Sequence, residues 1–284
     1  MFKIIEKSQP ATNVNRFIIE TPDVAKKALP GQFVILRLHE KGERIPITIA
    51  DADKIKNTIT LFIQEVGKTT IEMGKLKTGD YILDIVGPLG VPSHQENLGT
   101  VVCISGGVGV AVMYPVAKAL KEKGNKIISI LGARSKNFII LENEMKKISD
   151  EFYITTDDGS YGQKGFVSDV LKNLIAQLSN YPVANLVYAI GPVPMMKIVS
   201  EITKQHNLKT IVSLNPIMVD GTGMCGACRV SIGDVTKFAC VDGPDFDGHL
   251  VNWQELVNRL SVFKKEEKKS LDCYCKTTGC VERV

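Results

Sequence analysis

Between residues 101 and 214, the chain alternates between short apolar runs and stretches with helical periodicity. Strands this apolar are buried on both faces, and the helices between them lead from one parallel strand to the next. Glycine follows most of the runs, and such a sheet binds its ligand beyond the strand ends. The sequence therefore predicts an α/β doubly wound parallel-sheet domain over residues 99–215. The expected strands are 101–105, 126–131, 152–156, 185–190 and 210–214, and the expected helices are 110–123, 142–148, 167–178 and 194–206.

The segments on either side of this domain have different patterns. Residues 1–98 contain short apolar runs separated by Pro and Gly turn signals, which predict a small antiparallel β-barrel or sandwich. Residues 216–253 are rich in Gly and Cys and are expected to form a small module. Residues 254–284 are expected to form a C-terminal helix and a cysteine-containing tail. The fold class is therefore an α+β multidomain chain.

Composition excludes several classes of function. The 35 Lys and Arg residues against 31 Asp and Glu give a net charge of +4, which does not make a nucleic-acid-binding surface. No apolar run approaches the roughly 20 residues of a membrane span, and the N-terminus has no signal-peptide pattern. We therefore expect a cytoplasmic protein that binds neither nucleic acid nor membrane. Six of the seven cysteines lie in the last 60 residues, which favours a metal site over a disulfide scaffold.

The cysteine cluster has the spacing of an iron–sulfur site. Cys225 and Cys228 form a C-x-x-C pair, Cys240 follows, and glycines in the loop let backbone amides approach the sulfurs. Asp220 stands where the plant-type C-x4-C-x2-C pattern has its first cysteine. The sequence thus indicates a [2Fe–2S] site with one carboxylate ligand. A simple hairpin turn at Asp220 and a zinc site that includes His249 are the alternatives.

Three loops at the predicted sheet edge are candidates for nucleotide binding. Gly106-Gly107-Val108-Gly109 leads from a strand into a helix, whose amides and dipole favour a pyrophosphate. Gly191-Pro192 and Met195 follow the fourth strand, and Asp157-Asp158 follows the third, where a carboxylate could accept hydrogen bonds from ribose or nicotinamide. The alternative for the glycine loop is a tight turn without a ligand. For Met195 it is packing in the core, and for Asp157-Asp158 it is a solvated turn.

The first unit carries two further candidates. Arg44, Pro46 and Thr48 alternate along an extended segment, so they share one face and could meet a pyrophosphate and the edge of a flavin ring. Gly67, Thr69 and Thr70 offer amides and hydroxyls to a phosphate. Taken alone, these residues are more typical of a surface arginine and a turn threonine.

Together these segments resemble the ferredoxin-reductase-type flavoprotein superfamily, and within it the electron-transfer subunits of dihydroorotate dehydrogenase. Asp220 is a departure from that group and is similar to the small subunit of NADH-dependent reduced ferredoxin:NADP⁺ oxidoreductase, also known as a sulfide dehydrogenase subunit. The matching segments are RIPITI (44–49), GKTT (67–70), GPLG (87–90), SGGVGVA (105–111), TDDGSYGQKG (156–165), YAIGPVPMM (188–196) and the cysteine cluster.

The resemblance implies FAD, NAD(H) and a [2Fe–2S] cluster as cofactors. It implies a heterodimer with a larger subunit that holds FAD and [4Fe–4S] clusters, passes electrons to ferredoxin and carries out flavin-based electron bifurcation. It implies FAD contacts by residues 44–48 and 67–70, NAD(H) contacts by residues 106–109, 157–158 and 191–195, and iron ligation by Asp220, Cys225, Cys228 and Cys240. No side-chain acid or base is expected.

Other readings remain open at this point. One is an electron-transfer subunit of a dihydroorotate or other dehydrogenase, and another is a zinc-stabilised binding module without redox activity. Arg134, after the second strand, could meet the 2′-phosphate of NADP. The resemblance gives no role to Cys273, Cys275 and Cys280, which we expect to be free thiols.

Overall fold

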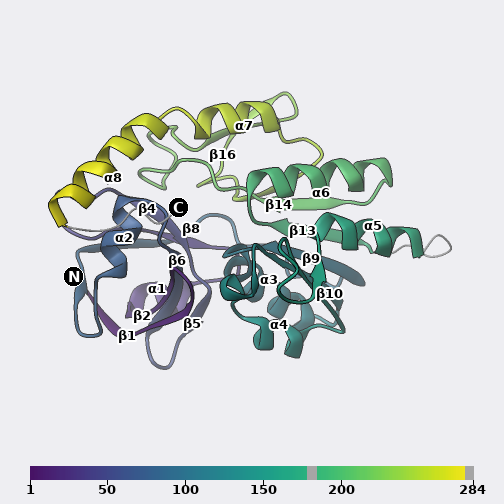
Figure 1. Ribbon diagram of the computed structural model, residues 1–284, viewed down its shortest axis with the longest axis horizontal. Helices are drawn as coiled ribbons and strands as arrows, with labels where there is room; N and C mark the ends of the chain where they lie inside the picture. The colour runs from purple at the N-terminus through teal and green to yellow at the C-terminus, as the bar shows by residue number, and fades with distance from the viewer. Residues whose placement is uncertain (178–183, 279–284) are drawn as a thin grey trace.

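The computed structural model describes residues 1–177 and 184–278, so the predicted helix end at 178 and Cys280 lie outside the described residues. The chain forms an N-terminal antiparallel part, a central parallel sheet with helices, and a C-terminal hairpin followed by two helices (Figure 1). The predicted order of the fold is confirmed.

The N-terminal part consists of a five-stranded and a three-stranded sheet, both antiparallel, with orders β5-β6-β2-β1-β7 and β4-β3-β8. Phe17 from the first sheet and Val34 from the second are buried in one core, which confirms the predicted antiparallel unit. Its elements are β1 (Phe2–Ala11), β2 (Val14–Glu20), α1 (Pro22–Lys27), β3 (Phe33–Arg37), β4 (Ile45–Thr48), β5 (Asp51–Asp53), β6 (Thr58–Gln64), α2 (Lys68–Gly74), β7 (Tyr81–Ile82) and β8 (Asp84–Leu89).

The central sheet has the strand order β12-β11-β10-β9-β13-β14-β17, and all neighbours are parallel except β14 and β17. Helices α5 and α6 cover one face and α3 and α4 the other, because their apolar stripes enter separate cores. The elements are β9 (Thr100–Gly106), α3 (Gly109–Glu122), β10 (Lys126–Ala133), a 3₁₀ turn (Lys136–Phe138), α4 (Glu142–Ile148), β11 (Glu151–Thr156), β12 (Gln163–Lys164), α5 (Val167–Gln177), β13 (Leu186–Ile190), α6 (Val193–Gln205), β14 (Thr210–Ser213) and β17 (Asp245–Asp247).

The order of the chain reverses at β9. Strands β10 to β12 lie on one side of β9, and β13 and β14 lie on the other. The carboxyl ends of β9 and β13 therefore border the crevice in which a doubly wound sheet binds its ligand.

The cysteine-rich segment is joined to the central sheet. Its last strand, β17, pairs antiparallel with β14 and places Phe246 opposite Val212. Cys228 and Cys240 are buried in the same core as residues of α6 and β14. The segment also contains the hairpin of β15 (Arg229–Ile232) and β16 (Val235–Phe238). The domain boundaries at 98, 215 and 253 stay predictions.

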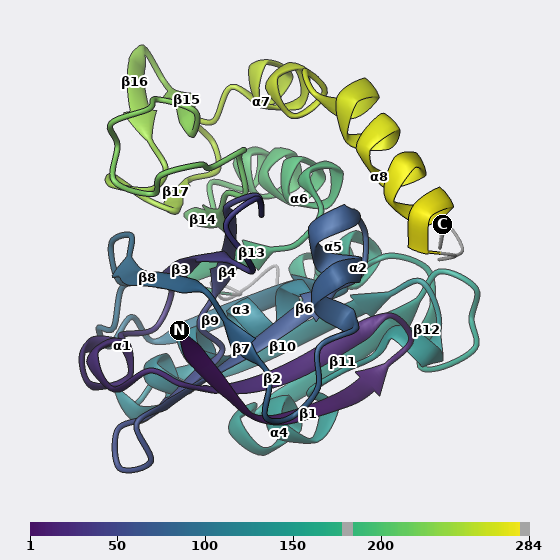
Figure 2. The same ribbon diagram turned by 90° about the vertical axis from the view of Figure 1, so that its left-hand side faces the viewer.

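Two helices end the described chain. α7 (Trp253–Leu260) packs beside the β15–β16 hairpin, and α8 (Lys264–Thr278) reaches α2 of the N-terminal part (Figures 1 and 2). Cys273 is free and exposed, but Cys275 is disulfide-bonded, so the expectation of free thiols was wrong for Cys275. No described helix is both long and apolar enough to span a membrane.

Candidate flavin, nucleotide and iron–sulfur site

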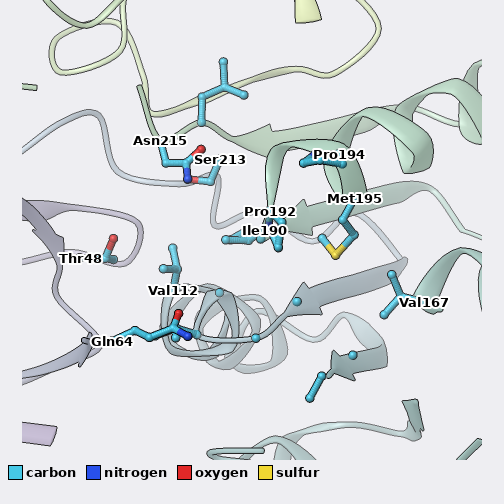
Figure 3. A pocket seen from close by; sticks show the side chains of 18 of the residues that line it. Thr48, Gln64, Val112, Val167, Ile190, Pro192, Pro194, Met195, Ser213 and Asn215 are labelled. Carbon is cyan, nitrogen blue, oxygen red and sulfur yellow. The ribbon is translucent and has the colours of Figure 1, made fainter. Parts of the chain in front are cut away.

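A large cavity lies where the N-terminal part, the central sheet and the cysteine-rich segment meet. Its volume is about 730 Å³, within the range of cofactor and ligand sites. Thr48 reaches it from β4, Val112 from α3, and Ser213 from the end of β14 (Figure 3). The cavity therefore lies at the predicted crevice and opens onto three parts of the fold.

The glycines between the end of β9 and the start of α3 are required for two different reasons. A Cβ on Gly106 would lie 2.6 Å from Met195 Sδ, and one on Gly109 would lie 2.6 Å from the Ile190 carbonyl oxygen, so both are required for close packing. Gly107 has φ +55°, and a Cβ there would meet nothing within 4 Å. Gly107 therefore faces open space in the cavity wall at the start of α3, where a pyrophosphate would approach the backbone.

The loop after β13 touches the loop after β9. A Cβ on Gly191 would lie 3.0 Å from the Gly106 amide nitrogen, so these two loops require glycine at their contact. Pro192 and Met195 line the cavity (Figure 3), as does Val108. The structure thus brings the two predicted nucleotide loops together.

The two aspartates after β11 lie in different surroundings, because only one of them lines the cavity. Asp157 is exposed and lines the cavity. Asp158 does not line it, because its Oδ1 accepts hydrogen bonds from the Ser160 backbone N–H at 2.9 Å and the Ser160 hydroxyl at 2.7 Å. These hydrogen bonds lower the pKa of Asp158. Of the two, only Asp157 can therefore contact a ligand in the cavity, and Asp158 belongs to a turn.

The predicted flavin contacts are also divided. Pro46 and Thr48 line the large cavity, whereas Arg44 lines a second cavity of about 170 Å³ together with Asp220. Arg44 precedes β4, so it does not continue the strand's alternation. The structure therefore separates Arg44 from the two residues with which the sequence grouped it.

The Gly67 loop lies outside both cavities. The Thr70 hydroxyl donates to the Gly67 carbonyl and accepts from the Gly67 N–H, each at 3.0 Å, and the Thr69 hydroxyl donates to Glu43 Oε2 at 2.7 Å. A Cβ on Gly67 would meet nothing within 4 Å, so open space lies beside the loop. The roles of Gly67, Thr69 and Thr70 toward FAD stay predictions.

The four predicted metal ligands lie in two pairs. Cys228 and Cys240 are buried with their sulfur atoms 3.1 Å apart. Cys225 is exposed, and its N–H donates to Asp220 Oδ2 at 2.7 Å, while the Thr222 N–H donates to Oδ1 at 2.9 Å. Within residues 1–177 and 184–278, no three His, Cys, Asp or Glu side chains converge as a metal-binding group.

The thiol and carboxylate groups, with the backbone N–H groups that donate to the sulfurs, are nevertheless of the types that hold an iron–sulfur centre. The Ala227 N–H donates to Cys225 Sγ and the Cys240 N–H to Cys228 Sγ, both at 3.5 Å, and amide donors to sulfur stabilise such clusters. Burial, followed by the hydrogen bond shared with Cys228, raises the pKa of Cys240 to about 12. Backbone hydrogen bonds, first from Thr222, lower the pKa of Asp220.

His249, the histidine of the zinc alternative, has a hydrogen-bond partner other than the thiols. His249 Nε2 lies 3.0 Å from the Thr203 hydroxyl, where α6 meets the cysteine-rich segment. A structural zinc site built on the cysteines would need an added histidine or further thiols.

Sequence reasoning missed a buried polar cluster at the junction of the three parts. The Ser93 hydroxyl donates to Asp245 Oδ2 at 2.6 Å, and the Tyr188 hydroxyl hydrogen-bonds both Ser93, at 3.0 Å, and Asp245. Burial raises the pKa of Asp245 and that of Tyr188. The only sequence signal is a tyrosine within the apolar run 186–190.

Comparisons with known proteins match both halves of this site. Residues 215–252 match the iron–sulfur cluster binding domain of dihydroorotate dehydrogenase B, and residues 103–201 match the oxidoreductase NAD-binding domain. The dihydroorotate dehydrogenase B (NAD(+)) electron transfer subunit homolog of Thermotoga maritima is 49% identical over 277 residues, which cover 98% of this chain and 96% of the relative. The corresponding subunit of Fusobacterium nucleatum is 36% identical over 248 residues, 84% of this chain and 93% of the relative.

A solved structure is equally similar. It belongs to an NADH-dependent reduced ferredoxin-NADP oxidoreductase studied for flavin-based electron bifurcation, with a TM-score of 0.90 and 48% identity over 96% of this chain and 98% of that chain.

The fold and the site define a ferredoxin-reductase-type oxidoreductase subunit that uses FAD, NAD(H) and a [2Fe–2S] cluster in electron transfer. The chain belongs to the family of dihydroorotate dehydrogenase B electron transfer subunits and their homologues.

Proposed function

We propose that the chain is the NAD(H)-side subunit of a flavin-based electron-bifurcating, NADH-dependent ferredoxin:NADP⁺ oxidoreductase. The observation that carries the proposal is the 48% identity and TM-score of 0.90 to such an enzyme over nearly the whole chain. Asp220, at the position of a first cysteine, supports the same choice among relatives.

The chain's own residues bind and orient the reactants. Gly107 leaves room for a pyrophosphate at the start of α3, and Asp157 can accept a hydrogen bond from a ribose hydroxyl. Pro46 and Thr48 line the cavity from the N-terminal part and Met195 lines it from α6, so they would contact the bound reactants. A bound flavin would supply the exchange between two-electron hydride chemistry and one-electron chemistry.

The cysteine loop forms the other end of the proposed path. Asp220, Cys225, Cys228 and Cys240 would hold the cluster, and its environment would set the potential. Pro244 lines the cavity four residues after Cys240, so this short segment connects the proposed flavin and iron sites. We further propose a larger partner subunit with FAD and [4Fe–4S] clusters, ferredoxin as acceptor through that partner, and a cytoplasmic location.

A second candidate is an electron transfer subunit of a dihydroorotate dehydrogenase, favoured by the names of the curated relatives. The partner distinguishes the two. Purification of the native complex without oxygen, followed by identification of the second subunit and analysis of flavin, iron and sulfide, tests both.

A partner with [4Fe–4S] clusters, and reduction of ferredoxin coupled to NAD⁺ reduction by NADPH, would support the first candidate. A partner that oxidises dihydroorotate would replace it with the second. A chain with zinc and no flavin, iron or sulfide would refute both.

A further inference from the structure

One arginine outside both matched domains reaches the cysteine loop. Arg259 lies on α7, beyond residue 252, and its Nη2 donates to the Ala227 carbonyl oxygen at 3.0 Å. Ala227 lies between Cys225 and Cys228. A half-buried guanidinium, separated by 32 residues along the chain, thus holds the turn that carries two of the four proposed ligands.

The helix that carries Arg259 is itself fixed to the cysteine-rich segment. Leu256 is 2% exposed and lies in the same core as Cys228 and Cys240. Trp253 Nε1 donates to the Gly248 carbonyl at 3.3 Å, and the Asn252 side chain caps the helix. Because its backbone is anchored, Arg259 presents its charge to the loop at little cost in conformational entropy.

The Ala239 N–H donates to the Cys228 carbonyl at 3.1 Å, but Cys225 itself is held, among the hydrogen bonds described, only from within residues 220–229. Cys225 is exposed, Met224 is 89% exposed, and Gly223 and Gly226 have positive φ angles. Arg229 also donates to the loop, to the Gly226 carbonyl at 3.0 Å, but it lies only three residues away and anchors the turn to nothing outside itself.

The bond from Arg259 acts on the peptide group that precedes Cys228. The Ala227 carbonyl and the Cys228 N–H belong to one peptide unit, so a cation on the carbonyl polarises that N–H and makes it a stronger donor. Donors and positive charge near an iron–sulfur cluster favour its reduced, more negative state.

We propose that Arg259 is a positioning residue for the [2Fe–2S] site, which fixes the Cys225–Cys228 turn through the Ala227 carbonyl and raises the reduction potential of the cluster. This inference rests on the proposed cluster. It gives α7 a role in electron transfer that neither matched domain includes.

The test compares three variants of the complete chain, purified without oxygen with its cofactors. Arg259→Gln removes the charge and Arg259→Lys keeps it. Gln254→Ala is the matched control on the same helix, because the hydrogen bond described for the Gln254 side chain goes to Asn258 of α7 itself. The readouts are iron and sulfide per chain, the EPR spectrum of the reduced cluster, its midpoint potential, and Trp253 fluorescence.

In Arg259→Gln we expect the ratio of reduced to oxidised cluster at a fixed potential to fall about tenfold, which is about 59 mV for a one-electron couple. The EPR spectrum should broaden as the turn becomes less ordered, Arg259→Lys should recover most of the shift, and Gln254→Ala should match the wild type. Loss of iron from Arg259→Gln alone, with unchanged Trp253 fluorescence, also supports the proposal.

Two results would overturn it. One is the same potential and EPR spectrum in Arg259→Gln and the wild type. The other is loss of the cluster in both Arg259 variants together with altered Trp253 fluorescence, because that would assign Arg259 to the packing of α7. A wild-type chain without iron and sulfide would instead refute the proposed function.

Discussion

Asp245 gives this chain a stability that depends on pH in the direction opposite to that of most carboxylates. Its carboxyl group is buried between Ser93 and Tyr188, and burial raises its pKa despite the hydroxyl groups around it. In the unfolded chain it titrates near its ordinary value of about 4. As the pH rises above that value, the unfolded chain releases a proton that the folded chain keeps.

The size of the pH dependence of the free energy of unfolding follows from this single proton. The contribution of Asp245 to the free energy of unfolding is fully present below the unfolded pKa and is lost as the pH rises toward the folded pKa. The slope of that loss is at most about 1.4 kcal/mol per pH unit. Asp245→Asn keeps a neutral, hydrogen-bonding side chain of the same size and removes the titration. We therefore expect the variant to gain stability relative to the wild type at each step above pH 4, by up to this slope.

Urea unfolding between pH 4.5 and 7.5 measures the effect. The single tryptophan, Trp253, lies beside the segment that carries Asp245 and reports its unfolding by fluorescence. Exposed Asp51→Asn is the matched control and should not change the pH dependence. Parallel curves for the wild type and Asp245→Asn, at equal m-values, would refute the assignment of a buried neutral carboxyl group.

Four further predictions concern the site itself. Gly106→Ala should destabilise the chain by about 1–3 kcal/mol in thermal unfolding, because the new methyl group meets Met195 Sδ at 2.6 Å. Gly107→Ala should cost only about 1–2 kcal/mol for its positive φ but should weaken NADH binding, measured by titration, and equal binding in both proteins would contradict a pyrophosphate site there. Asp220→Ala should change the EPR spectrum and potential of the cluster, and an unchanged signal would show that the carboxylate does not bind iron. Asp157→Asn should raise the Kd for NADH more than that for NADPH, and an equal effect on both would place Asp157 away from the 2′-hydroxyl of the adenosine ribose.

The sequence predicted the parallel sheet well because its strands are continuous apolar runs, which depend little on their neighbours. In residues 1–98 its apolar runs, at 33–38, 59–63 and 81–86, did not include β1 and β2, where buried residues such as Ile4 and Phe17 have exposed or half-exposed charged neighbours. It could not predict β17, because a three-residue strand of sequence DFD becomes a strand only by pairing with β14, some 35 residues earlier along the chain.

The site shows the same division between local and non-local information. Spacing along the chain located the cysteine pair and the glycine loops, because each is a short local motif. The separation of Arg44 from Thr48 depends on where β4 begins, which the sequence RIPITI does not reveal. The pairing of Ser93 with Asp245 spans 152 residues, and no local pattern reports it.

These non-local contacts explain how the chain can keep two proposed redox sites in register. Cys240 belongs to the cysteine loop and Pro244 lines the large cavity, so the segment between them sets the spacing of the proposed flavin and iron sites. That segment is held where Asp245 meets Ser93 and Tyr188, and where the Leu214 N–H donates to the Pro244 carbonyl at 2.9 Å. Ser93 lies between the N-terminal part and the central sheet, and Tyr188 and Leu214 belong to the central sheet or directly follow it, so movement of either part would change the spacing of the two proposed sites. The hydrogen bonds among Ser93, Tyr188 and Asp245 therefore link the spacing of the two proposed sites to the stability of the contact between the three parts of the fold.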